Sequence, residues 1–129
     1  MPSSEAEATI AIDHVQVTVP PELEAAAKVF YGQVLGLGEI AKPEALKRRG
    51  GAWYALGNAQ FHIAIEPGAA GAGSRRHVCF RVADLEGMRA RVLAAGFAVT
   101  EDQPQADGLE RFFTHDPAGN RVEIGWRPA

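Results

Sequence analysis

Four residues of this 129-residue chain combine metal-ligand chemistry with a regular spacing: His14, His62, His77 and Glu123. His62 follows His14 by 48 positions, and Glu123 follows His77 by 46. The second pair begins 63 residues after the first, about half the length of the chain. Imidazole and carboxylate groups are ligands for Zn, Fe, Mn, Ni and Co, and two histidines with one carboxylate form many catalytic metal sites. The spacing indicates an internal duplication, and the four residues together favour the binding of a metal ion.

Each of the four residues lies in a short segment that alternates apolar and polar side chains. Successive residues of a strand point to opposite faces of a sheet, so each segment has one apolar face and one face that carries the ligand. A single histidine on a half-exposed strand needs no metal to explain it. Four equivalent positions with ligand-type side chains favour metal binding, because an unpaired Glu123 in an apolar strand would be costly. The segments are IDHVQVTV (12–19), QFHIAIE (60–66), RHVCFRV (76–82) and NRVEIGW (120–126).

The elements between these strands repeat in the same order. Residues 22–35 have helical apolar spacing and end at Gly36, and a second helix begins after Asp84 and ends at Gly96. Each half therefore reads strand, helix, strand, strand, strand, with a helix for only one face of its sheet. The four ligand-type residues are expected on the opposite, concave face. Further strands are predicted near 37–42, 51–57, 97–101 and 109–115, polar loops at 43–49 and 102–108, and a hairpin turn at Gly57-Asn58.

Size and composition fit one compact soluble domain. Hydrophobic residues make up 47% and charged residues 22%, and the net charge of −3 gives no reason to expect nucleic acid binding. We find no apolar run long enough for a membrane span and no secretory signal, and a single cysteine, Cys79, fits a reducing cytoplasm. We expect one domain over 1–129, with a first module at about 9–66, a linker at 67–75, a second module at about 76–126, and a frayed terminus at 1–8.

Several motifs resemble the vicinal oxygen chelate superfamily, which includes glyoxalases, bleomycin-resistance proteins and extradiol dioxygenases. They cover nearly the whole chain, and the last of them is the most specific. The motifs are IDHVQV at the start, FYGQVLGL at 30–37, HVCFRVADL at the start of the second half and FFTHDPAGNRVEI at 112–124.

The resemblance implies an α+β fold of two βαβββ modules that form a cup-shaped, barrel-like mixed sheet with helices on the outside. It also implies one divalent metal ion (Zn, Fe, Mn, Ni or Co) held by His14, His77 and Glu123. His62 is at the fourth ligand position, which glyoxalases fill with glutamate. A histidine there can still bind metal, but it removes one negative charge and one carboxylate base.

Further residues are candidates for catalysis or substrate binding. Glu123 and Glu66 are candidate bases for proton transfer. A solvated strand end explains Glu66 equally well. Trp53, Phe113 and Arg111 can alternate onto the ligand face and shape the pocket, although both aromatics also fit the core and Arg111 could pair with an acidic neighbour. Cys79, beside two candidate ligands, is either a reactive thiol or a small packing residue, and His115 is expected at the surface.

The resemblance leaves two classes of function. In the first, the chain is a metal-dependent enzyme that acts on a small oxygenated molecule, with a glyoxalase-like isomerase or lyase ahead of a thiol transferase or ring-cleaving dioxygenase. In the second, it is a metal-free small-molecule binding or drug-resistance protein. The retained ligands and the aromatic content of only 8% favour the enzyme. Relatives often form dimers, and edge strands need partners, so we also expect a homodimer.

Overall fold

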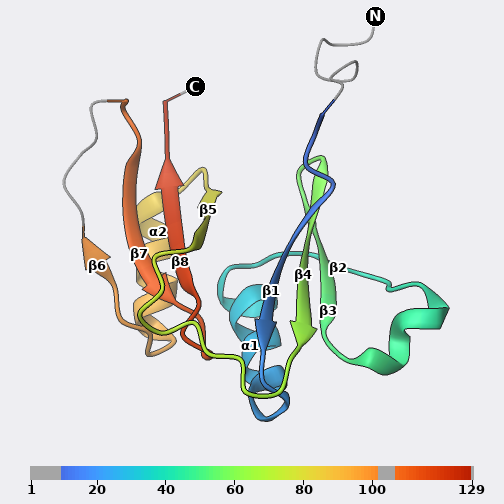
Figure 1. The fold of residues 1–129 in the computed structure, drawn as a ribbon. Helices are drawn as coiled ribbons and strands as arrows, with labels where there is room; N and C mark the ends of the chain where they lie inside the picture. The colour runs from blue at the N-terminus through green and yellow to red at the C-terminus, as the bar shows by residue number, and fades with distance from the viewer. Residues whose placement is uncertain (1–9, 102–106, 129) are drawn as a thin grey trace, which may run out of the picture.

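The computed structural model describes residues 10–101 and 107–128 (Figure 1). The frayed terminus predicted at 1–8 and most of the polar loop predicted at 102–108 lie outside the described residues. The first half contains β1 (His14–Val19), β2 (Glu39–Ile40), β3 (Ala52–Leu56) and β4 (Ala59–Ile65). The second contains β5 (His77–Arg81), α2 (Leu85–Ala94), β6 (Thr100–Glu101), β7 (Glu110–His115) and β8 (Arg121–Trp126).

The helix predicted at 22–35 is confirmed, but its geometry changes along its length. A 3-10 turn η1 (Pro21–Leu23) leads into α1 (Glu24–Lys28), and a wider π-type segment η2 (Val29–Val34) follows. Proline suits the first turn because its missing N–H would have no partner there. Phe30, Tyr31 and Val34 of the wider segment are all buried. The polar loop predicted at 43–49 is instead a 3-10 helix, η3 (Glu44–Arg49), in which the Leu46 N–H donates to the Pro43 carbonyl at 2.9 Å.

Both predicted helix boundaries and the predicted hairpin are present. Gly36 has a φ of +84°, the left-handed conformation expected just after a helix. The Asp84 side chain accepts a hydrogen bond of 2.9 Å from the Gly87 N–H and so caps α2. Gly57, with a φ of +57°, begins the two-residue turn between β3 and β4.

The two halves have the same sheet topology, as the duplication predicts. The strand orders are β1-β4-β3-β2 and β5-β8-β7-β6. In each sheet the first and last strands of the half pair in parallel, and the other pairs are antiparallel. The α+β fold with two βαβββ modules is therefore confirmed. The two four-stranded sheets remain separate and do not close into a barrel.

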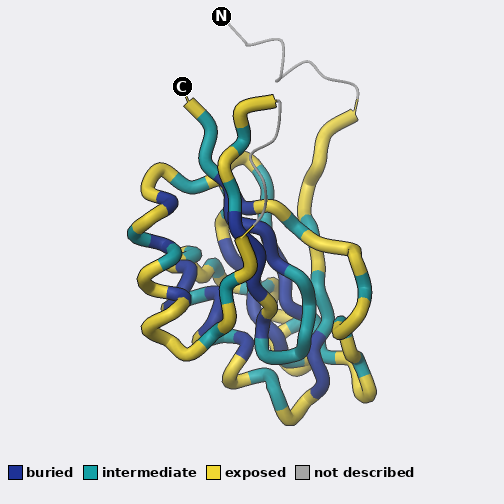
Figure 2. The backbone as a smooth tube through the Cα atoms, turned by 90° about the vertical axis from the view of Figure 1, so that its left-hand side faces the viewer, coloured by how far each residue is buried: buried dark blue, intermediate teal, exposed yellow. Residues whose placement is uncertain are grey.

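One hydrophobic core joins the halves (Figure 2). The Tyr31 ring lies 4.6 Å from that of Phe61 on β4, and Phe61 lies 5.3 Å from Phe80 on β5, measured between ring centroids. Phe30 packs edge-on against Phe97, at 4.8 Å, beyond α2. The apolar faces of both sheets are thus buried with the helices, and the alternation leaves the ligand-type residues on the other faces.

Hydrogen bonds across the halves reinforce this core. The buried hydroxyl of Tyr31 donates to Oδ2 of Asp116 at 2.8 Å, and Oδ1 of Asp116 accepts from the backbone N–H groups of Ala118 and Asn120 at 2.9 Å each. The side-chain amide of Asn120 donates to the Thr18 carbonyl at 3.0 Å. The turn between β7 and β8 is therefore tied to both η2 and β1. No helix in the described part of the chain is long and apolar enough to span a membrane.

Candidate metal and substrate site

Three rings from neighbouring strands form a stack on the ligand face of the first sheet. Trp53 of β3 lies directly across from His62 of β4, with ring centroids 4.0 Å apart and planes inclined by only 3°. The other face of the His62 ring meets His14 of β1, at 4.4 Å and 15°. His62 is thus enclosed between an indole and a second imidazole. Trp53 therefore lies on the same face of the sheet as His14 and His62.

The two histidines of this stack differ in exposure. The side chain of His14 is 45% exposed, whereas His62 is 4% exposed. Burial lowers the pKa of His62, and nearby His14 lowers it further, so its ring is neutral at pH 7. Nδ1 of His14 lies 2.8 Å from Oδ2 of Asp13, which leaves its Nε2 atom facing away from that bond. Nε2 of His62 lies 2.9 Å from Oε1 of Gln60.

A cavity of about 610 Å³ lies next to the ring stack. Its wall includes His14, Trp53 and His62, together with the cations Lys42 and Arg49. The ammonium group of Lys42 donates to the carbonyl of Gly50 and is thereby held at the cavity wall. Lys42 and Arg49 bring two positive charges to this wall against the one negative charge of Asp13, and this excess suits a ligand that carries negative charge. Sequence reasoning missed both cations, because only the chain path after β2 brings them here.

The second sheet holds a polar cluster around Glu123. Nε2 of His77 lies 2.8 Å from Oε1 of Glu123, and Nε of Arg111 lies 3.0 Å from Oε2. Glu123 is 5% exposed, so the cation and the histidine compensate a buried carboxylate. Arg111 therefore pairs with an acidic neighbour on the ligand face, one of the two roles expected for it.

The hydrogen bonds of His77 constrain the tautomer of its ring. Nδ1 lies 2.9 Å from the carbonyl oxygen of Arg75, which can only accept, so Nδ1 must carry a proton. Nε2 of His77 and Oε1 of Glu123 are 2.8 Å apart. A second proton must lie between them, because without it the lone pairs of the two atoms would repel each other. A divalent cation can replace that proton. Metal-bound histidines usually donate their other N–H to a carbonyl or carboxylate, as His77 does here.

Other candidates on the second sheet take clear positions. Phe113 lies across from Glu123 and meets the His77 ring edge-on at 5.7 Å, while the Arg121 guanidinium lies 3.9 Å from the Phe113 ring centroid. Cys79 is exposed, but partial burial and the neighbouring Glu123 raise the pKa of its thiol to about 11. The reactive-thiolate interpretation of Cys79 is therefore unsupported. His115 is exposed, as predicted.

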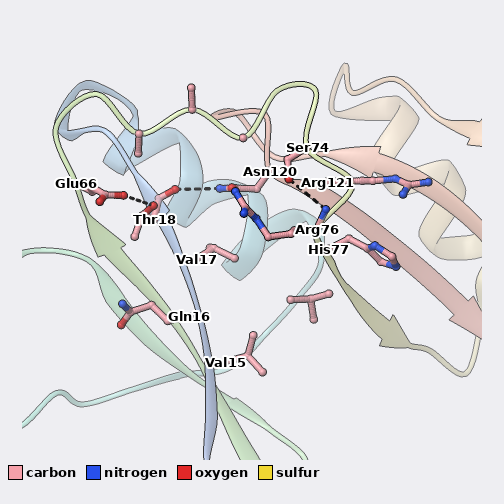
Figure 3. Close-up of a pocket in the computed structure, with 14 residues that line it drawn as sticks. Val15, Gln16, Val17, Thr18, Glu66, Ser74, Arg76, His77, Asn120 and Arg121 are labelled. Carbon is pink, nitrogen blue, oxygen red and sulfur yellow. Dashed lines mark hydrogen bonds between the residues drawn. The ribbon is translucent and has the colours of Figure 1, made fainter.

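Glu66 lies in a second cavity, of about 420 Å³, between β1, the linker and the start of β5 (Figure 3). Its Oε1 atom accepts a hydrogen bond of 2.8 Å from the hydroxyl of Thr18. The same cavity is lined by His77 and Arg76, but not by His14 or His62. Glu66 thus shares a cavity with one half of the ligand set.

The structure pairs the four ligand-type residues as His14 with His62 and His77 with Glu123. A two-fold relation between the duplicated halves would instead place His14 opposite His77 and His62 opposite Glu123. Within residues 10–101 and 107–128 of one chain, no group of three or more His, Cys, Asp or Glu side chains is arranged to hold a metal ion. The two pairs stay on two separate sheets, because the apolar faces, and not the ligand faces, form the shared core.

This fold, with two repeated modules that each carry a pair of ligand-type residues, matches a known class of protein. The model of the Glyoxalase/Bleomycin resistance protein/Dioxygenase superfamily matches residues 11–124, and the chain belongs to this superfamily. A comparison with curated proteins gave no significant match.

Solved structures show the same fold. A protein from Bacillus anthracis described as a glyoxalase family protein is 38% identical, with a TM-score of 0.83 over 94% of this chain and 98% of that one. Lactoylglutathione lyase from Agrobacterium tumefaciens is 24% identical, with a TM-score of 0.68 over 90% and 92% of the two chains. TnmS3, an antibiotic binding protein from Streptomyces sp. CB03234, is 20% identical, with a TM-score of 0.71 over 94% and 98%.

Proposed function

We propose that this protein is a metal-dependent isomerase or lyase of the glyoxalase kind, which acts on a small molecule with two neighbouring oxygen atoms. The observation that carries the proposal is the contact between His77 and Glu123. A buried carboxylate and an imidazole nitrogen approach to 2.8 Å while the other imidazole nitrogen is bonded to a carbonyl. This arrangement supplies donor atoms of the kinds found in metal sites. A divalent cation could occupy the position between them in place of a proton.

The proposed ligands come from two copies of the chain. His77 and Glu123 of one copy would combine with His14 of a second copy, because the described residues of one chain do not gather three donors. Among the strands of the described residues, β1 pairs with β4 alone and β5 with β8 alone, so each has an edge that can face a second copy. We therefore infer a homodimer with two equivalent sites.

The metal, one divalent ion of Zn, Fe, Mn, Ni or Co, would stabilise negative charge that develops on a substrate oxygen. The residues of the chain supply the other functions. Glu123 has its oxygens bonded to His77 and Arg111 and is held in place, whereas Glu66 is more open and accepts only from Thr18 in the described contacts. Of the two candidate bases, Glu66 is therefore the better placed to take up a proton.

The substrate would lie against Trp53 of one copy and Phe113 of the other. Trp53 stacks on His62 and Phe113 packs against His77, so each aromatic ring adjoins a ligand pair. Lys42 and Arg49 add positive charge to the wall of the larger cavity. These features favour a substrate with an apolar part and a negatively charged group.

Metal content tests the proposal directly. Protein purified without added metal or chelator is analysed by mass spectrometry of its metals, beside the His77→Ala and Glu123→Ala variants. About one divalent ion per chain, lost in both variants, supports the site. His115→Ala is the matched control, since His115 ends β7 on the same sheet but is exposed. Wild-type protein that binds no metal after reconstitution contradicts the proposal.

The second candidate is a metal-free binding protein for a small organic molecule. It is favoured by the absence of a three-donor group within the described residues of one chain and by the cavity beside the Trp53 stack. A ligand that binds equally well to wild-type and Glu123→Ala protein, with no metal in either, would support this function.

A further inference from the structure

The parallel stack of Trp53, His62 and His14 conflicts with the use of both histidines as ligands to the same ion. A metal bound to imidazole lies close to the plane of the ring, about 2.0–2.1 Å from nitrogen. The planes of His14 and His62 are inclined by 15°, with centroids 4.4 Å apart. Planes so arranged meet only on the order of 15 Å away, far beyond a metal–nitrogen bond of about 2 Å. One ion cannot lie in both planes unless a ring leaves the stack.

The His14 and His62 rings also differ in how accessible they are to a metal ion. The side chain of His14 is 45% exposed, and its Nε2 atom has no hydrogen-bond partner within the described residues. His62 is 4% exposed, with both ring faces covered and Nε2 held by Gln60 at 2.9 Å. His14 is therefore available to an incoming ion, and His62 is not.

The stack also accounts for how the His14 ring is held. The carboxylate of Asp13 that bonds Nδ1 is 92% exposed, and such an exposed contact restrains a side chain only weakly. The face of His62 is the more buried contact. The His62 ring is in turn held by Trp53, which lies across from it on β3. The planes of these two rings are parallel to within 3°. Side chains from three adjacent strands thus hold the His14 ring in one orientation.

We propose that His62 is a positioning residue that holds the His14 ring in place for a metal ion, and that it is not itself a ligand. This inference rests on the proposed function, and it assigns His14, His77 and Glu123 as the protein ligands. Trp53 acts in the same way from the far side of His62. The geometry requires a flat aromatic ring at position 62. It does not require a nitrogen or oxygen atom there.

Two substitutions at position 62 separate the roles. His62→Phe keeps a flat face but removes both nitrogens, whereas His62→Glu keeps a metal ligand but removes the face. Zn²⁺ and Co²⁺ affinities are measured by competition with a chelator on the full chain, together with the Co²⁺ absorption spectrum. If His62 is a positioning residue, the metal affinity of His62→Phe should stay within about threefold of the wild type. The affinity of His62→Glu should fall about 10–100-fold, as for other residues that orient ligands. If His62 is a metal ligand, His62→Phe should bind metal more weakly than His62→Glu and should have a changed Co²⁺ spectrum. That result would overturn the proposal.

A variant that fails to fold is replaced by a change on the neighbouring strand. Trp53→Leu keeps every nitrogen but removes one side of the stack. Weaker metal binding by this variant supports positioning, and unchanged affinity overturns it. Circular dichroism of each variant shows whether it is folded.

A metal-free measurement keeps this inference separate from the proposed function. The ring signals of His14 are followed by NMR in protein stripped of metal. Signals in His62→Phe that match the wild type, with loss of ring order in His62→Glu, support the stack even if the wild type binds no metal and the proposed function fails. Identical His14 signals in all the variants would overturn the positioning role.

Discussion

The Nε2 atom of His77 lies 2.8 Å from Oε1 of Glu123, a residue 46 positions further along the chain. The contact crosses the parallel pair β5 and β8, where Glu123 lies directly across from Cys79. Arg111 reaches the other oxygen from β7 at 3.0 Å. Three strands thus place an imidazole, a carboxylate and a guanidinium together on the face that the helices leave open.

Replacement of Glu123 by Gln should both abolish metal binding and destabilise the fold. Arg111, whose side chain is 14% exposed, would lose its contact with the Glu123 carboxylate, and breaking a buried ion pair costs about 3–5 kcal/mol. Urea unfolding and metal analysis measure the two effects. Restoration of much of the stability, but not of metal binding, in the double variant Glu123→Gln with Arg111→Met would identify the lost contact between Arg111 and Glu123 as the cause. Equal stability of wild type and Glu123→Gln would contradict the ion pair.

Mixing two inactive variants should restore metal binding if the site joins two copies. His14→Ala and His77→Ala each lack a ligand at both sites of a homodimer. A mixed dimer has one site with both mutations and one site with neither. We expect about one ion per mixed dimer after co-refolding, measured by metal analysis of the purified mixed species. A site built within one chain gives no recovery, and a monomeric mass by light scattering also excludes the shared site.

Loss of the Tyr31 hydroxyl should weaken the connection between the halves. Tyr31→Phe removes the 2.8 Å hydrogen bond to Asp116, which is 3% exposed and would lose a donor. We expect about 1–3 kcal/mol of lost stability in urea unfolding. Tyr54→Phe is the matched control, since Tyr54 is equally buried at 1% but has no hydrogen bond to its hydroxyl within the described residues. Similar effects of the two changes would contradict this role of Tyr31.

Cys79 should react slowly with alkylating agents at neutral pH despite its exposure. Its pKa of about 11 means that the thiol stays protonated, since burial and the charge of Glu123 oppose the thiolate. The thiolate fraction, and with it the rate of reaction with iodoacetamide, should rise about tenfold per pH unit up to nearly pH 11. Glu123→Gln removes one cause of the shift and should lower the midpoint. A rate that levels off near pH 8.5 would contradict the raised pKa.

The alternation of the sequence predicted which side chains share a face. His14, His62 and Trp53 lie on one face of the first sheet, and Arg111, Phe113 and Glu123 lie on one face of the second. These placements follow from the two-residue period of a strand, which is a local property. The duplicated order of strands and helices also came from local signals such as Gly36 and Asp84.

The sequence by itself determined the two modules, their open faces and the kinds of donor atom on them. Only the tertiary structure decided which donors meet. Phe61 and Phe80 bury the apolar faces of both sheets in one core, so His14 meets His62, and His77 meets Glu123. Ring orientation is equally non-local, because the plane of His62 is fixed by Trp53 from a different strand. Alternation specifies the face on which a side chain lies, whereas its partners depend on how the sheets pack and how the rings stack.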